Sequence, residues 1–289
     1  MIPFSAGDVR SYLEHLGFMP DLQPGCTTYL FLSGASLGSD ASSSGSTIAL
    51  EVIPAREDHY DDVCLTYLEG GELTANKGTS DPGSYHYHRQ GRANLVWCHP
   101  HRFVRGKHNG NGQAVLRPEG GSNRFWRDAD GDARQDAEEG IQGGNGTMLI
   151  HAMGGSRIQR WGAGCLGIWD PKNYRGELWA AWRDQAYRTC EKLGTVQVVI
   201  MPGSDFARYL ADPKHHQPTL WPGATGPWVV GLQRRLNSWS GDSRQQLGVD
   251  GDFGRGTLKR LLEFQAEGAL TADGIVGPRT WASLAAWRD

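Results

Sequence analysis

The first part of the chain carries apolar residues spaced as on one face of a helix. They lie between Ser5, a residue type that caps helix N-termini, and Gly17, a residue type that ends helices. The apolar residues are Val9, Tyr12, Leu13 and Leu16. We therefore predict a short amphipathic helix over residues 5–18.

The pattern then changes to short runs rich in β-branched and aromatic residues, which are typical of strands. Strands are predicted over residues 27–32, 47–53 and 62–68, and we expect 47–53 to be the neighbour of 27–32. A Gly-Gly turn then returns the chain through Leu73. The Ser/Gly-rich residues 33–46 are predicted to form a flexible loop. This order indicates a β-rich, hairpin-connected fold.

Helical spacing returns over residues 177–193, and Gly194 is placed to end that helix. A strand is predicted to follow over residues 195–201. The Pro- and His-rich residues 213–222 are predicted to be a linker. The apolar face expected for the helix consists of Leu178, Ala181, Trp182, Ala186 and Cys190.

The C-terminal part of the chain contains an internal repeat. An Asp-Gly turn at residues 250–251 recurs at residues 273–274, and each turn is followed by a glycine that enters an amphipathic helix. Pro278 fits the first position of the second of these helices. A further helix is predicted over residues 228–237. Short helices of this kind bury their apolar faces only as a set, so we expect one small three-helix domain.

The length, the net charge and the lack of long apolar runs limit the classes of protein to which the chain can belong. The chain has 289 residues, enough for one large or two ordinary domains, and a net charge of −3. This charge, without a basic block, argues against nucleic acid as the main partner. No apolar run has the length of a membrane span, so membrane insertion is not expected, and the N-terminal residues lack the pattern of a signal peptide. We expect a monomer that uses no cofactor.

One stretch carries the residue types of a thiol nucleophile. An apolar run ends on His151, and Cys165 follows in a turn of small residues that includes Gly164. A nearby imidazole activates a thiol because it takes the proton and stabilises the thiolate. Small residues before the cysteine let a substrate carbonyl approach and leave backbone N–H groups for a developing oxyanion. The alternative is an inert cysteine in a protein core.

The order of Ile150-His151 and then Gly162-Ala163-Gly164-Cys165 resembles the signature of the L,D-transpeptidase (YkuD-like) family. This resemblance implies a β-rich catalytic domain in which Cys165 is the nucleophile and His151 is its base. The turn at residues 78–83 and the Gly106-Lys107-His108 segment are similar to a phage and bacterial subgroup of that family. The wider resemblance covers about residues 60–200.

The chain departs from the family pattern at two places. Gly162 stands where the family usually has Ser or Thr, and Leu166-Gly167 follows the cysteine where many members have an arginine. An arginine that meets a substrate carboxylate would then come from the loop before Cys165. The residues predicted to bind substrate are Lys107, His108, Arg157, Arg160 and Trp161.

Two metal sites remain open as alternatives. The His-x-His pairs at residues 86–88 and 99–101 place two imidazoles on one face of a strand, which zinc sites use when a third ligand joins them. The acidic residues 128–139 supply several carboxylates around Gly131, as calcium loops do, although the glycine is not at the position of an EF-hand. A half-exposed polar strand and a solvated acidic loop are the simpler explanations, and we predict no metal.

The spaced residues of the C-terminal repeat resemble the peptidoglycan-binding domain 1 family. The resemblance covers about residues 223–287, and it implies that bacterial peptidoglycan is the partner. The predicted organisation is α+β: a catalytic domain over residues 1–212, a linker over 213–222 and a three-helix peptidoglycan-binding domain over 223–289.

Together these features predict a peptidoglycan-active cysteine enzyme that acts at the bacterial cell wall. We favour a hydrolase of stem peptides that resembles an endolysin, encoded by a phage and released at lysis or delivered by a secretion system. The alternatives are an L,D-transpeptidase that forms cross-links, a zinc peptidase that uses the His-x-His pairs, and a wall-binding protein with an inert Cys165.

Overall fold

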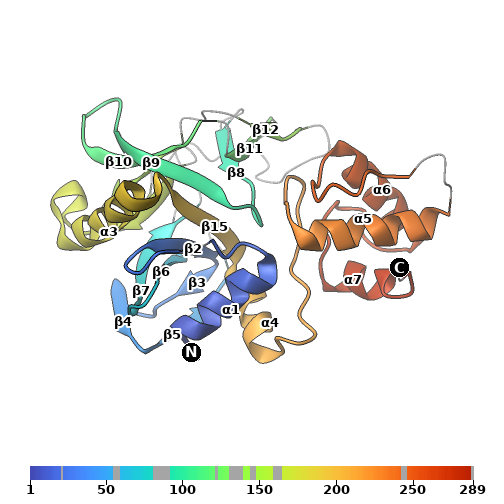
Figure 1. Ribbon diagram of the computed structural model, residues 1–289, viewed down its shortest axis with the longest axis horizontal. Coiled ribbons are helices and arrows are strands. Elements are labelled where there is room, and N and C mark those ends of the chain that lie inside the picture. The colour runs from blue at the N-terminus through green and yellow to red at the C-terminus, as the bar shows by residue number, and fades with distance from the viewer. Residues whose placement is uncertain are drawn as a thin grey trace.

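The computed structural model describes residues 1–20, 22–54, 59–80, 92–120, 123–129, 139–143, 148–158, 165–241 and 246–287. The described chain is a mixed α+β protein with a β-barrel in its N-terminal part and helices at its C-terminus. Figure 1 shows the strands on one side of the molecule and the three C-terminal helices on the other. The predicted α+β class, with a β-rich part followed by C-terminal helices, is confirmed. The three helices are α5 (Pro227–Ser240), α6 (Arg255–Glu267) and α7 (Pro278–Leu284).

Nine strands form the largest sheet of the described chain. They are β2 (Thr27–Ser33), β4 (Ser42–Gly45), β6 (Asp62–Leu68), β7 (Leu73–Thr79), β9 (His101–Lys107), β10 (Ala114–Pro118), β13 (Ile150–Met153), β14 (Leu166–Trp169) and β15 (Val196–Pro202). Their order is β14-β13-β10-β9-β15-β2-β6-β7-β4. Because β7 also pairs with β14, all of these strands except β4 form a closed circuit.

The barrel closes where Gly78 lets β7 approach β14. Ile168 of β14 lies opposite Gly78 of β7. A Cβ atom on Gly78 would lie 2.4 Å from the carbonyl oxygen of Gly167, and one on Gly167 would lie 2.3 Å from the sulfur of Met153. Glycine is therefore required at position 78 for β7 to approach β14, whereas the neighbour of position 167 is the flexible Met153 side chain of β13.

The other strands of the described chain form two small sheets, and their pairing contradicts two of the predictions. One contains β1 (Ile2–Ser5), β5 (Thr47–Val52) and β3 (Ala35–Ser36), and the other contains β12 (Gln142–Gly143), β11 (Arg124–Asp128) and β8 (Arg92–Leu95). The prediction that residues 47–53 neighbour 27–32 is wrong, because β15 and β6 occupy both edges of β2 and β5 pairs with β1. The prediction of a loop over 33–46 is also wrong in part, because these residues include β3 and β4. The polar residues of β4 suit an exposed edge that pairs with β7.

Helix α1 (Ala6–Leu16) confirms the helix predicted over residues 5–18. The Ser5 hydroxyl accepts a hydrogen bond from the backbone N–H of Asp8 at 3.3 Å, and the Asp8 carboxylate accepts one from the backbone N–H of Ser5 at 2.7 Å. This capping box fixes the start of the helix, and Gly17 ends it with a φ of 78°.

Helix α3 (Glu177–Leu193) confirms the helix predicted over these residues, and Gly194 ends it as expected. Its buried face differs from the prediction in detail. Ala181 is exposed and Leu178 is half-buried, whereas Trp179 is fully buried. The face is shifted because Trp179 and Trp182, whose rings lie 5.6 Å apart, form its centre.

The barrel strands separate two apolar cores, and β2 shows how. Tyr29 and Phe31 belong to the core covered by α3, and Leu30 and Leu32 belong to the core shared with α1 and α4 (Gly203–Ala211). Alternation along a strand sends these pairs to opposite faces. Figure 1 shows α3 on one side of the strands and α1 and α4 on another.

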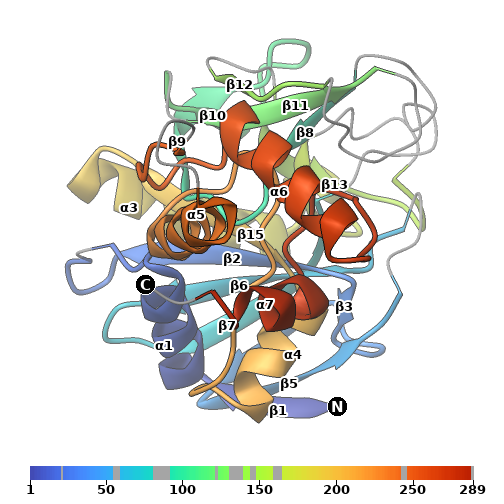
Figure 2. The ribbon, with the colours of Figure 1, turned by 90° about the vertical axis from the view of Figure 1, so that its right-hand side faces the viewer.

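The C-terminal helices share the core of α1 and α4, because the buried residues of α5, α6 and α7 belong to the same cluster. Figure 2 shows these helices lying in front of the barrel strands. Arg124 of β11 forms two hydrogen bonds with the Asp252 carboxylate, at 2.7 and 2.9 Å. The indole N–H of Trp228 donates to the backbone carbonyl of His15 at 2.7 Å. The helical part is therefore packed directly against α1 and against the small sheet that contains β11.

Residues 213–222, the predicted linker, lie between α4 and the C-terminal helices and contact them. Leu220 is fully buried and bridges to Val276. The indole N–H of Trp281 donates to the backbone carbonyl of Pro218 at 2.8 Å. These contacts hold the segment against α7.

A buried carboxylate ties this segment to the N-terminal helix. Asp205 of α4 is fully buried and accepts hydrogen bonds from the Tyr12 hydroxyl at 2.8 Å and from the backbone N–H and hydroxyl of Thr219 at 3.0 and 2.9 Å. His216 lies 3.2 Å from the same carboxylate, and Arg208 forms an ion pair with it. Asp205 thus joins α1, α4 and the segment after α4.

Replacing Asp205 by alanine is expected to lower the free energy of unfolding at pH 7 by about 3–5 kcal/mol, because its partners remain buried and unpaired. Burial raises the pKa of Asp205, but His216, Arg208 and Thr219 outweigh it and hold the pKa below its ordinary value of 3.8. The carboxylate therefore stabilises the fold above about pH 4, and this contribution is lost as the pH falls further. Urea unfolding of both proteins from pH 7 to pH 3 measures the difference.

The exposed Asp212 provides the control, since its replacement by alanine should change stability little. An Asp205→Ala protein as stable as the parent at pH 7 would contradict the structural role of this carboxylate.

Candidate catalytic site

The candidate site lies on the adjacent parallel strands β13 and β14. Ile150 pairs with Leu166, and His151 pairs with Gly167. Alternation directs Ile150 and Leu166 into the core under α3 and directs their neighbours His151 and Cys165 to the other face. The predicted base thus lies on β13, and the predicted nucleophile directly precedes β14, the strand that is hydrogen-bonded to β13. The strand predicted to end at His151 instead begins at Ile150 and continues to Met153, because Ala152 and Met153 also pair with β14.

His151 is held in a defined tautomer. Its side chain is 2% exposed, and Nδ1 lies 2.9 Å from the backbone carbonyl oxygen of Ala152. A carbonyl only accepts hydrogen bonds, so Nδ1 carries the hydrogen and the neutral ring has its lone pair on Nε2. A lone pair on Nε2 is what a general base requires.

Cys165 differs from the other cysteines in its exposure. All five are free thiols, and Cys165 is half-buried whereas the others are buried. Burial raises the pKa of Cys64 and Cys98, and it raises the pKa of Cys190 to about 11. Those thiols therefore stay protonated and unreactive at neutral pH.

The Cys165 sulfur has its own hydrogen-bond donor. The backbone N–H of Leu149 donates to Sγ at 3.3 Å. A donor directed at sulfur favours the negatively charged thiolate. The side chain also packs against a small apolar cluster of Tyr60, Met153 and Ile158.

Two further rings surround His151. Tyr174, from the 3₁₀ helix η1 (Asn173–Arg175), stacks on it with ring centres 6.2 Å apart, and the His108 ring meets it edge-on at 5.8 Å. Burial raises the pKa of Tyr174 to about 12, and the proximity of Cys165 adds to this effect. Tyr174 is thus a neutral hydroxyl close to both members of the pair.

Asp170 positions the segment that carries Tyr174. Its carboxylate accepts hydrogen bonds from the backbone N–H groups of Lys172 at 2.8 Å and Trp179 at 3.0 Å. A Cβ atom on Gly176 would collide with this carboxylate, so only glycine fits there. The sequence suggested neither Asp170 nor Tyr174 as a site residue. No local pattern marks them, since Asp170 lies too far before α3 to resemble a helix cap.

The structure places the predicted substrate-binding residues unevenly. His108 lies against His151, whereas Lys107 is exposed at the end of β9 and Arg157 is exposed after β13. Gly164, Arg160 and Trp161 lie outside the described residues.

The candidate metal ligands do not gather in the described part of the chain. Within it, no three His, Cys, Asp or Glu side chains form a group that could hold a metal ion. His99 bonds to the Thr225 hydroxyl at 2.9 Å, and His101 bonds to the backbone carbonyl of Val96 at 2.7 Å. Burial lowers the pKa of His101 to about 3, so its ring is neutral. His86 and His88 lie outside the described residues, as do residues 130–138 of the acidic loop.

The C-terminal repeat forms two equivalent hydrogen-bond networks. The Gln233 amide donates to the Asp250 carboxylate at 2.8 Å and accepts from the backbone N–H of Gly251 at 3.0 Å. In the second unit Gln265 bonds in the same way to Asp273, at 3.0 Å, and to Gly274, at 3.0 Å. Gly251 and Gly274 have φ angles of 73° and 70°. The repeated residues are therefore structural, as the sequence indicates.

These features define a barrel with a histidine–cysteine pair, joined to a three-helix module. Residues 225–284 match the family described as a putative peptidoglycan binding domain. A zinc D-Ala-D-Ala carboxypeptidase of Streptomyces albus G is 39% identical over 66 residues, which are 23% of this chain and 26% of that protein. The chain thus spans about a quarter of that relative's length. No solved structure matches the chain.

The C-terminal helices are therefore similar to a peptidoglycan-binding domain. No helix among the described residues is long and apolar enough to cross a membrane.

Proposed function

We propose that the protein is a cysteine-dependent peptidoglycan peptidase with a catalytic domain of the L,D-transpeptidase type. The observation that carries the proposal is that His151 lies on β13 and that Cys165, which directly precedes the paired strand β14, packs against Met153 of β13. The C-terminal domain supports it, because a wall anchor raises the local concentration of a polymeric substrate around the thiol.

In the proposed reaction the Cys165 sulfur attacks the carbonyl carbon of a stem-peptide amide. His151 Nε2 takes the thiol proton and passes it to the leaving amine nitrogen as the C–N bond breaks. Water then attacks the thioester, His151 takes a proton from it, and the products are a shortened stem with a new carboxylate and the regenerated thiol. An amine that attacked in place of water would form a cross-link.

The proposal assigns oxyanion stabilisation to backbone N–H groups of the turn that includes Gly164 and Cys165. It places His108 at the edge of the site, and it keeps Lys107, Arg157, Arg160 and Trp161 as predicted substrate contacts. The relative that matches over a quarter of its length is a carboxypeptidase, which supports hydrolysis as the outcome.

Mass analysis of purified peptidoglycan incubated with the parent protein and with Cys165→Ala tests the proposal. Shortened stem peptides are expected with the parent and not with the variant. Cys190→Ala is the matched control, because its thiol is buried in α3 and its products should equal those of the parent.

Three other results would overturn parts of the proposal. Equal products from the parent and Cys165→Ala would exclude thiol chemistry. New cross-links without shortened stems would indicate a transpeptidase. The absence of products from either protein, with wall binding intact, would indicate a binding protein.

A further inference from the structure

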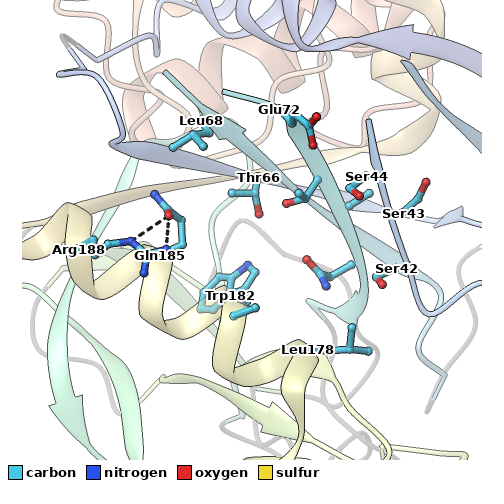
Figure 3. A pocket seen from close by; sticks show the side chains of 14 residues that line it. Ser42, Ser43, Ser44, Thr66, Leu68, Glu72, Leu178, Trp182, Gln185 and Arg188 are labelled. Atoms are coloured by element: carbon cyan, nitrogen blue, oxygen red, sulfur yellow. Dashed lines mark hydrogen bonds between the residues drawn. The ribbon is translucent and has the colours of Figure 1, made fainter. Parts of the chain in front are cut away.

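A second candidate site lies away from the histidine–cysteine pair. A cavity of about 410 Å³ opens between the strands β4, β6 and β7 and the helix α3. Figure 3 shows the serines of β4 at one side of it, Gln185 and Arg188 at the other, and Thr66 and Trp182 between them. Neither His151 nor Cys165 lines this cavity.

The floor of the cavity is a row of neutral hydrogen-bonding side chains set by strand register. Ser44 of β4 pairs with Thr74 of β7, which pairs with Thr66 of β6. Ser42 pairs with Asn76 in the next row on the same face. Cross-strand partners project to the same side of a sheet, so these hydroxyl and amide groups form one polar surface.

The Thr66 side chain on this surface lacks a hydrogen-bond partner. Its side chain is 5% exposed, and its hydroxyl oxygen has no hydrogen-bond partner within the described residues. Buried hydroxyl groups are almost always hydrogen-bonded, since an unbonded one has lost its water without a replacement. A polar ligand in the cavity would restore the missing bond.

The opposite wall and the charges restrict the ligand. Leu178, Ala181 and Trp182 of α3 give the cavity an apolar side. Its charged lining residues are Glu72 and Arg188, whose charges cancel. A ligand with a net charge would therefore gain little here, whereas a neutral molecule with hydroxyl or amide groups and an apolar surface fits both sides.

We propose that this cavity binds a neutral, N-acetylated sugar of the peptidoglycan glycan strand. A pyranose ring presents hydroxyl groups to the Ser/Thr/Asn floor and C–H groups to the α3 wall. The cavity volume falls in the range of small-molecule sites, about 300–1,000 Å³. The choice of an N-acetylated sugar rests on the proposed function, because that function makes peptidoglycan the substrate. The cavity would then hold the glycan while the thiol acts on its peptide.

Titration of the ¹⁵N-labelled full chain with N,N′-diacetylchitobiose tests the inference by NMR. The indole N–H resonance of Trp182, assigned by its loss in Trp182→Phe, is expected to shift and saturate. This resonance reports on the cavity and not on the C-terminal domain. Thr66→Val, which keeps the side-chain shape and removes the hydroxyl, should weaken binding about tenfold.

Ser44→Phe fills the mouth of the cavity from an exposed strand position and should abolish the saturable shift. Ser204→Phe, at an exposed position of α4, is the matched control and should bind like the parent. A Trp182 resonance that does not move, or equal affinities for the parent and both cavity variants, would overturn the inference.

The two proposals fail separately. Sugar binding at Trp182 together with peptidoglycan products that do not depend on Cys165 would refute the proposed function and keep the sugar site. Cys165-dependent products together with an unresponsive Trp182 resonance would refute the sugar site and keep the proposed function.

Discussion

Replacing Cys165 by alanine, His151 by alanine, or both at once is expected to lower the rate of stem-peptide cleavage by the same factor, about 10³ or more. The reason is that the two residues act on one bond: the thiol needs its proton removed, and the base has no purpose without the thiol. Removing either member therefore removes the whole pathway. The activity that remains comes from substrate binding alone.

Initial rates of product formation on purified peptidoglycan, compared for the parent, the two single variants and the double variant, measure this effect. His215→Ala is the control, because His215 is exposed after α4 and should leave the rate unchanged. Losses that multiply in the double variant would mean that the two residues act independently. That result would contradict their action as one catalytic pair.

Local sequence signals predicted α1, α3 and the C-terminal helices, but they did not predict α4. Ser5, Gly17 and Gly194 mark helix ends through side-chain caps and positive φ angles, which depend on neighbouring residues alone. The same holds for the C-terminal repeat, where Pro278 begins α7. Such features need no knowledge of the distant chain.

Strand pairing could not be predicted in this way. Residues 47–53 were expected beside 27–32 because they follow in sequence, but β15, from far along the chain, takes that place. Barrel closure depends on Gly78, which lies opposite Ile168 of β14, and no local pattern relates these two distant segments. The Ser-rich strand β4 resembles a loop because an edge strand needs no apolar face of its own.

The candidate site was predicted in part. His151 and Cys165 could be proposed from the sequence because each lies in a recognisable local pattern, an apolar run that ends on histidine and a turn of small residues before cysteine. Tyr174 and Asp170 were not, since their role depends on the folding of η1 against β13. The functional roles of the pair stay predictions until the cleavage experiment is done.

Replacing Gln233 by alanine is expected to lower the free energy of unfolding by about 3 kcal/mol. Gln233 is 1% exposed, and its amide bonds to the Asp250 carboxylate, the Asp252 carbonyl and the backbone N–H of Gly251. The variant leaves the buried N–H of Gly251 without its partner and opens a cavity beside α6. Because the α5–α7 module shares a core with α1 and α4, the loss should appear in the unfolding of the whole chain.

Urea unfolding measures the loss of stability, and pull-down with purified peptidoglycan measures whether the variant still binds the wall. The control is Gln246→Ala at an exposed glutamine, whose free energy of unfolding should stay within about 0.5 kcal/mol of the parent. Gln265→Ala repeats the test in the second unit, where the same bonds join Gln265 to Asp273 and Gly274. Equal losses would show that each repeat depends on its own glutamine. If Gln265→Ala alone were destabilising, the first loop would owe its order to the Arg124–Asp252 contact with β11, and the repeat would be equivalent in geometry but not in energy.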